Sequence, residues 1–189
     1  RVDNNPAARF YETLNNVLWQ GHSYGRPVTG LDEEILSLKR QDAVAFYRTY
    51  YAPNNAILVL SGDIDKATAR RLAEKYYGRL ETTDIKQTEF SKLPDFYRAK
   101  VEMRLPEVRL GRMVKIFAVP SLKMAPKEAY VFEVLAEYMA GDENAPMYQE
   151  LVLRQKKALS LGVGYSGVAR SYGTFGITAV PVNEADEAF

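Results

Sequence analysis

The sequence predicts an α+β fold in which a mixed, largely antiparallel β-sheet has helices packed on one face. Amphipathic helical patterns fill most of the first half, and two strand-like runs, residues 158–170 and 173–182, close the chain. Residues 101–105 alternate apolar and charged side chains, which is typical of a strand with one face in water. Helices and strands are therefore partly segregated along the chain, as expected of an α+β protein.

The first part of the chain predicts two helices separated by an ordered loop. Apolar side chains recur at helical spacing over residues 7–19, and Pro6 suits the first turn of that helix. Residues 21–30 hold three glycines and a proline, which indicates a break in regular structure. A short helix over residues 31–38 is expected to follow.

The next stretch predicts a helix with a sharp end. Apolar side chains from Ala43 to Tyr50 follow the i, i+3, i+4, i+7 spacing of one helical stripe. Pro53 ends this helix because its ring clashes with the preceding turn and it has no N–H to donate. Asn54 and Asn55 then supply a turn, since asparagine tolerates left-handed backbone and bonds to its own main chain.

Residues 56–60 are continuously apolar, which predicts a strand covered on both faces. Ser61, Gly62 and Asp63 break this strand. Asp65 is then placed to cap a helix over residues 67–77.

The second half predicts two strands, two helices and two further strands. Residues 81–96 form a polar surface connection, followed by strands at 101–105 and 113–119. The spacing predicts helices over residues 127–139 and 147–157 before the two final strands. The first of these helices is expected to turn inward four apolar side chains, Val131, Val134, Leu135 and Tyr138.

Composition excludes several classes of protein. The 25 basic and 24 acidic side chains leave a formal charge of +1, so electrostatics recruits neither nucleic acid nor an anionic membrane. No apolar run approaches the ~20 residues of a membrane helix. Cysteine is absent, which rules out disulfides and thiolate metal sites within these 189 residues.

Chemistry-bearing motifs are scarce. His22 is the only histidine, and neither HExxH nor HxxEH occurs, so the usual zinc ligand sets are missing. His22 is interpreted as structural, with a catalytic role as the weaker alternative. Residues 162–167 match GxGxxG, but no helix follows them, so a glycine-containing strand is preferred over a dinucleotide site.

Both ends suggest a piece of a longer protein. Residue 1 is arginine, and residues 183–189 read as the opening of a helix that stops short. The alternative is a complete domain with a ragged tail.

Taken together, the motifs resemble the pitrilysin/insulinase family of zinc peptidases, the inverzincins. The resemblance rests on RVDNNP at 1–6, GHSYGRPVTG at 21–30, FYRTYYAPNNAILVLSGDID at 46–65, YYG at 76–78 and KALSLGVGYSG at 157–167. It implies a mitochondrial-processing-peptidase-like metallohydrolase fold. The motif residues are interpreted as structural: Asp3, Asn4, Pro6, His22, Tyr24, Arg26, Pro27, Tyr51, Pro53, Asn54, Asn55, Gly62 and Asp63.

The resemblance implies that the family's zinc site lies outside this chain, in the sequence that precedes it. Residues 1–30 correspond to the tail of the zinc-bearing domain, and residues 31–189 to a second, non-catalytic domain truncated at its C-terminus. The family's HxxEH motif and its third glutamate ligand lie upstream of Arg1, so no metal ligand, catalytic residue or substrate-binding residue is carried onto this sequence. Zinc is expected in the full-length protein and no cofactor in this fragment.

The family also uses an Arg…Tyr pair to hold substrate. Alignment with LREKRGLAYS puts Val152 and Leu159 at those two positions, and neither side chain can donate a hydrogen bond. The resemblance therefore implies that a second homologous half or a partner subunit supplies the pair.

Two functions remain open from the sequence. The first is a fragment of a zinc metalloendopeptidase that hydrolyses peptide substrates in a clamshell chamber. The second is a non-catalytic homologue that acts as a scaffold or assembly subunit, and a stand-alone peptide-binding module is a weaker third. The resemblance favours the bacterial periplasm or cell envelope as the compartment.

Overall fold

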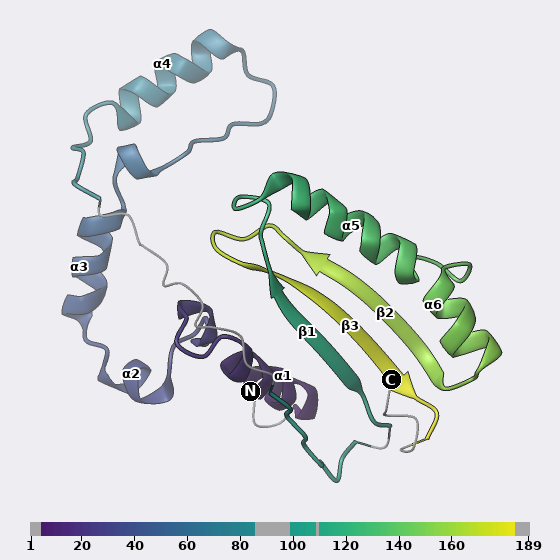
Figure 1. Cartoon of the computed structure of the whole chain (residues 1–189). Helices are drawn as coiled ribbons and strands as arrows, with labels where there is room; N and C mark the ends of the chain where they lie inside the picture. The colour runs from purple at the N-terminus through teal and green to yellow at the C-terminus, as the bar shows by residue number, and fades with distance from the viewer. Residues whose placement is uncertain (1–4, 86–98, 109, 184–189) are drawn as a thin grey trace. The chain divides into compact units, whose positions relative to one another are not determined.

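The computed structural model describes residues 5–85, 99–108 and 110–183 of the chain. These residues belong to two compact units, one made of Arg1–Gly25 with Phe90–Phe189 and the other of Arg26–Glu89. Figure 1 shows the elements of both units. The predicted domain boundary after residue 30 stays a prediction.

The first unit is built on a three-stranded antiparallel sheet. Its strands are β1 (Met113–Val119), β2 (Ala158–Ser166) and β3 (Gly173–Pro181), in the order β1-β3-β2. In this register, Phe175 of β3 pairs with Phe117 of β1 on one side and with Tyr165 of β2 on the other. The α+β prediction is confirmed, and the strands in the described residues are all antiparallel.

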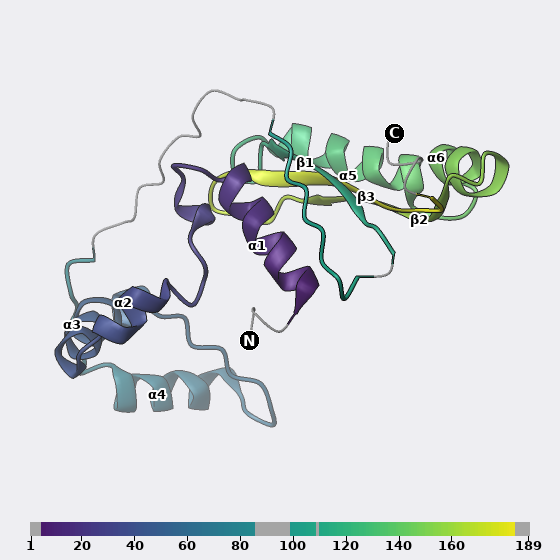
Figure 2. The same ribbon diagram turned by 90° about the horizontal axis from the view of Figure 1, so that it is seen from below.

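Helix α5 (Pro126–Ala140) lies along one face of this sheet (Figures 1 and 2). Ala129 and Ala136 are buried against the sheet, where their small side chains allow the helix to approach closely. Phe132 fills the space between them, stacked 5.4 Å from Tyr165 and tilted 5.8 Å from Phe175 between ring centroids. Aromatic pairs of this geometry add to the stability that burial provides.

This packing corrects the predicted orientation of α5. The four side chains expected to face inward are exposed: Val131, Val134, Leu135 and Tyr138. The helix carries apolar residues on two faces, and the stripe with alanines and one phenylalanine fits the sheet. Periodicity alone could not choose between the two stripes.

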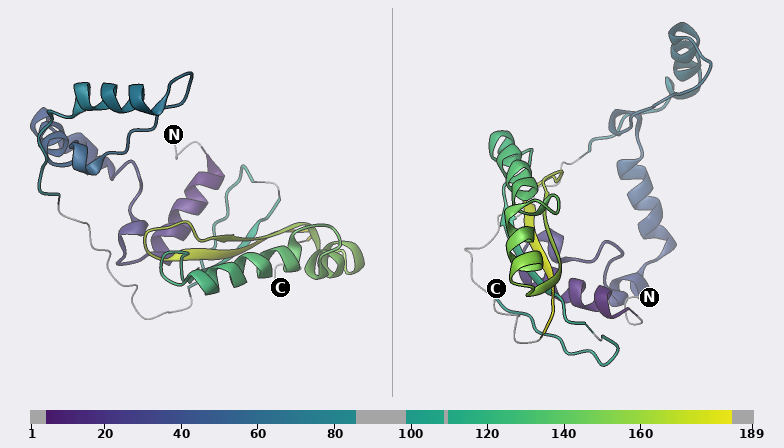
Figure 3. Two further views of the ribbon diagram at one scale, coloured as in Figure 1. Left: turned by 90° about the horizontal axis from the view of Figure 1, so that it is seen from above. Right: turned by 90° about the vertical axis from the view of Figure 1, so that its right-hand side faces the viewer.

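The other elements of the first unit frame the sheet. Helix α1 (Pro6–Leu18) begins at the cap Asn5, whose Oδ1 accepts the Ala8 N–H at 3.1 Å. Figure 3 shows α1 on the side of the sheet away from α5. It leads into the 3-10 turn η1 (Ser23–Gly25). A short helix α6 (Pro146–Tyr148) and a π-helical segment η3 (Gln149–Arg154) replace the single helix predicted over 147–157.

The second unit is helical in its described part. It contains α2 (Asp32–Ser37), α3 (Arg40–Tyr50), the 3-10 turn η2 (Pro53–Asn55) and α4 (Lys66–Tyr77). Asp65 caps α4 as predicted, because its Oδ1 accepts the Thr68 N–H at 2.9 Å. Lys39 provides no side-chain cap for α3, and the Asp42 carboxylate accepts the Lys39 N–H at 2.8 Å instead.

Two predicted strands are wrong. Residues 56–60 form no helix or strand and are exposed, and Ile57 is 92% exposed. A strand needs a partner strand, and the described part of this helical unit offers none. Residues 101–105 keep the predicted alternation, half-buried at Val101, Met103 and Leu105, without forming ladder hydrogen bonds.

Candidate functional site

His22 lies in the loop after α1 and is one of the most buried polar residues that the structure describes. Its side chain is 4% exposed. Its Nδ1 accepts the backbone N–H of Tyr24 at 3.1 Å, and its Nε2 lies 3.3 Å from the Oγ of Ser171. Because Nδ1 accepts a hydrogen bond, the neutral ring carries its proton on Nε2 and donates it to Ser171.

A second hydrogen bond reinforces the same contact. The backbone N–H of Ser171 donates to the Tyr24 hydroxyl at 2.9 Å. Ser171 lies in the turn between β2 and β3, so the loop after α1 is tied to a turn that is 149 residues away in sequence. Both segments belong to the first unit.

Aromatic rings enclose His22. The ring centroid of Tyr24 lies 4.7 Å away, that of Trp19 5.4 Å and that of Tyr172 6.0 Å. Trp19 is itself buried, at 5% exposure. Burial in this cluster lowers the pKa of His22 below its usual value, because the charged ring would lose its hydration.

This geometry argues against a Ser–His catalytic pair. A general base must present a free lone pair to the serine hydroxyl, and here Nε2 holds the proton. The His22 cluster, defined as Trp19, His22, Tyr24, Ser171 and Tyr172, links the loop after α1 to the turn between β2 and β3. Local sequence patterns missed Ser171 and Tyr172, because the contact depends on the folded path of the chain.

The next motif residues shape the start of the second unit. The guanidinium of Arg26 forms an ion pair with the exposed carboxylate of Glu34. The hydrogen bond that Arg26 donates within this ion pair is the largest cause that lowers the pKa of Glu34. The hydrogen bond from the Leu31 N–H is the second cause. The carbonyl of Pro27 accepts the Gly30 N–H at 2.9 Å, and Gly30 has a φ of +88° that favours glycine.

The Pro-Asn-Asn motif holds main-chain atoms together. Asn54 donates to the Thr83 carbonyl at 2.8 Å and accepts the Thr83 N–H at 3.3 Å. Asn55 donates to the carbonyl of Tyr50 at 2.9 Å. Pro53 opens η2, as its fixed φ allows. These contacts bring the two ends of the segment from residue 54 to residue 83 together, and they do not form a ligand site.

The remaining motif residues lie apart from one another. Tyr51 is 69% exposed, with its ring centroid 5.0 Å from that of Tyr47. Gly62 has a φ of +147°, and its carbonyl accepts the Ile64 N–H, while Asp63 is exposed. Pro6 occupies the first turn of α1. Asp3 and Asn4 lie outside the described residues, and the functional roles of all the motif residues stay predictions.

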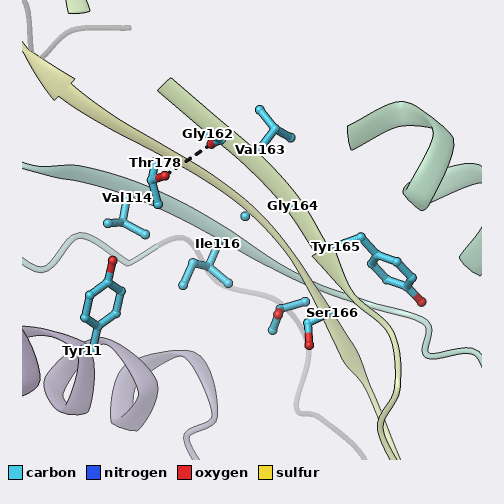
Figure 4. Close-up of a pocket in the computed structure, with 11 residues that line it drawn as sticks. Tyr11, Val114, Ile116, Gly162, Val163, Gly164, Tyr165, Ser166 and Thr178 are labelled. Carbon is cyan, nitrogen blue, oxygen red and sulfur yellow. Dashed lines mark hydrogen bonds between the residues drawn. The ribbon is translucent and has the colours of Figure 1, made fainter. Parts of the chain in front are cut away.

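The sheet face opposite α5 has a shallow hollow of about 420 Å³ (Figure 4). Its floor is formed by glycines on β2 and β3, where Gly164 pairs directly with Gly176. Tyr11 of α1 points toward Val114 at one side, whereas Tyr165 points to the other side of the sheet. Among the described residues that line the hollow, the polar groups are hydroxyls and none is charged.

The described residues do not form a metal centre. No group of three or more histidines, aspartates or glutamates lies close enough to hold an ion in the described ranges. Val152 lies on η3 and Leu159 on β2, the latter 53% exposed. Neither side chain has a polar group at the positions that the Arg…Tyr pair would occupy.

Residues 37–189 match the family described as the peptidase M16 inactive domain. The chain belongs to this family. The resemblance to the pitrilysin/insulinase peptidases is thereby confirmed, and the chain is a non-catalytic domain of the zinc protease family.

Known relatives include both proteases and subunits. The zinc protease PqqE of Helicobacter pylori is 25% identical over 161 residues, covering 84% of this chain and 36% of the relative. A probable mitochondrial-processing peptidase subunit beta of Schizosaccharomyces pombe is 35% identical over 71 residues, covering 38% of this chain and 16% of the relative. The chain thus spans 36% or less of the length of these two relatives.

Solved structures share the fold. A peptidase M16 inactive domain from Pseudomonas fluorescens superimposes with a TM-score of 0.75 at 16% identity, covering 95% of this chain and 42% of that one. A complex III2 structure from Candida albicans gives a TM-score of 0.71 at 19% identity over 96% of this chain and 44% of that one. In the described part of the chain, no helix has the length and apolar character to cross a membrane.

Proposed function

We propose that the protein containing this chain is a zinc metalloendopeptidase and that this domain forms a non-catalytic wall of its substrate chamber. The observation that carries the proposal is the family match over residues 37–189 together with the similarity to a zinc protease. The hollow on the sheet is consistent with a non-catalytic chamber wall, because the described residues that line it present backbone and hydroxyl groups and no charged side chain. Peptides are the proposed substrates.

The residues that the structure describes do not fit a catalytic zinc ion. Zinc needs three protein ligands with an open position for water. His22 is the only histidine in the sequence, and both of its ring nitrogens are engaged in hydrogen bonds. We therefore place the proposed HxxEH site elsewhere in the protein, and none of the residues described in this structure takes a step in the hydrolysis.

The proposal also includes a second half or partner subunit. Val152 and Leu159 cannot orient a peptide backbone by hydrogen bonding. A homologous half that supplies an arginine and a tyrosine would complete the substrate grip. The mitochondrial-processing peptidase relative is itself named as a subunit, which supports an assembly of two halves.

Zinc content and proteolysis of the full-length protein test the proposal. We expect about one zinc per catalytic half and cleavage of an unstructured peptide that a chelator abolishes and zinc restores. Replacing the glutamate of HxxEH with glutamine should abolish cleavage and preserve zinc. A full-length protein without HxxEH and without zinc would overturn the proposal.

The second candidate is a non-catalytic assembly subunit. The similarity in fold to a chain of a complex III2 structure favours it. A folded, zinc-free protein that copurifies in fixed stoichiometry with a partner would support this candidate over the peptidase. A zinc-loaded, proteolytically active protein would exclude it.

A further inference from the structure

We propose that the His22 cluster is an acid-sensitive clasp, in which protonation of His22 releases the loop after α1 from the turn between β2 and β3. The proposal concerns the first unit of this chain and does not depend on proteolysis. It rests on the hydrogen-bond pattern around one buried ring.

The Nδ1 atom of His22 is already engaged in a hydrogen bond. This nitrogen accepts the backbone N–H of Tyr24 at 3.1 Å, so its lone pair is already used. A proton added at Nδ1 would point at another N–H, and two donors cannot form a hydrogen bond. The charged ring must therefore break the contact with the Tyr24 backbone or leave its place.

The His22 ring and Tyr24 together hold the turn between β2 and β3. Nε2 lies 3.3 Å from Ser171 Oγ, and the Ser171 N–H donates to the Tyr24 hydroxyl at 2.9 Å. Tyr24 thus contacts His22 through its backbone and Ser171 through its side chain. Movement of the Tyr24 backbone displaces the hydroxyl as well, so the two links between loop and turn are coupled.

Aromatic side chains surround the ring of His22. Among the described residues, the titratable groups that face it are the phenols of Tyr24, from its own loop, and of Tyr172, from the turn between β2 and β3. From the end of α1 it faces the indole of Trp19, which does not titrate. The surroundings of the ring among the described residues are therefore aromatic.

The direction of the pH effect follows from burial. The pKa of His22 in the folded chain is lowered below 6.5 because the charged ring loses hydration. The unfolded chain therefore binds the proton more readily than the folded chain does. The stability that the clasp contributes is present above pH 6.5 and is lost as the pH falls through and below that value.

The ring itself can be followed by NMR, because His22 is the sole histidine of the 189 residues. We expect a ¹⁵N signature of the neutral Nε2–H form at about pH 7 and a titration midpoint below 6.5. Amide exchange, corrected for its intrinsic pH dependence, should show Tyr24 and Ser171 losing at least about tenfold in protection through that midpoint. The amide of Ala129, which donates to the carbonyl of the N-cap residue Ala125 at 3.0 Å, serves as the internal control and should stay protected.

Two variants separate the clasp from general acid unfolding. His22→Asn keeps an oxygen acceptor for the Tyr24 N–H and does not titrate, so protection at Tyr24 should stay flat across the same range. Ser171→Ala removes the acceptor of the Nε2 proton, which the neutral and the charged ring both donate, so the titration midpoint should fall further below 6.5. A midpoint at or above 6.5 in the unaltered chain, or protection that does not follow the ring, would overturn the proposal even if His22→Asn fails to fold.

Discussion

Asn54 shows how a motif residue can act on the main chain of a distant segment. Its amide exchanges two hydrogen bonds with Thr83, 29 residues further on, at 2.8 and 3.3 Å. An asparagine amide has both a donor and an acceptor, so it can replace a strand-like pairing between two backbones. Aspartate would lose the donor, and alanine would lose both.

We expect Asn54→Ala to lower the free energy of unfolding by about 1–2 kcal/mol, since each net hydrogen bond contributes roughly 0.5–1.5 kcal/mol and these are exposed. Asn54→Asp should fall between the alanine variant and the original chain. Urea denaturation followed by circular dichroism measures both. Asn16→Ala, an exposed asparagine on α1, is the control and should change stability little. Equal losses for Asn16→Ala and Asn54→Ala would contradict the role of the Thr83 contact.

Two glycines on β3 differ in what surrounds them. A Cβ on Gly173 would lie 2.5 Å from the backbone carbonyl oxygen of Ser166, which cannot move aside easily. A Cβ on Gly176 would meet its nearest atom, the Lys115 carbonyl oxygen, at 3.9 Å. The first position therefore requires glycine for close approach, and the second lies open on the hollow.

Gly173→Ala should destabilise the domain by about 1–3 kcal/mol through overpacking against the backbone. Gly176→Ala should be neutral or stabilising by roughly 0.5 kcal/mol, because alanine loses less backbone entropy in a strand. Thermal unfolding of the two variants side by side gives the comparison. If Gly176→Ala were as unstable as Gly173→Ala, the open space beside position 176 would be contradicted.

At the scale of the element, helix ends were the most predictable feature. Asp65 caps α4 through a hydrogen bond to Thr68, and Pro6 starts α1 as its fixed φ requires. These signals act over three or four residues, so the local sequence contains all the information that they need. Strand pairing depends on a distant partner, and for this reason residues 56–60 and 101–105 were predicted as strands that the structure does not form.

The orientation of α5 can be tested on two positions of the same helix. Val134 is 69% exposed, whereas Ala136 is 7% exposed and faces the sheet. Val134→Glu should change the free energy of unfolding by no more than about 0.5 kcal/mol. Ala136→Glu should lower it by at least about 3 kcal/mol, because it buries a charge without a partner. Chemical denaturation measures the free energy of unfolding of both variants. A larger loss for Val134→Glu than for Ala136→Glu would show that the stripe predicted from the sequence faces the sheet.

At the scale of the whole molecule, the candidate site shows where sequence reasoning ends. The sequence identified His22 and Tyr24 through their motif and interpreted His22 as structural. It could not provide Ser171, because a contact across 149 residues leaves no periodicity or spacing to detect. The absence of a local zinc motif was visible, whereas the engagement of both ring nitrogens required the folded structure.

Zinc binding by this chain can be tested directly, because a relative of the chain is named a zinc protease. Any ligand that binds the folded chain and not the unfolded chain raises its stability, by about 2.7 kcal/mol at a concentration one hundred times the dissociation constant. His22 has no free nitrogen, and the acidic side chains in the described residues are not grouped around a common point. Adding zinc to this chain should therefore leave its melting temperature unchanged, and His22→Asn should respond to zinc as the original chain does. A zinc-dependent rise in melting temperature with one-to-one binding by calorimetry would contradict this expectation and place a metal site within these 189 residues.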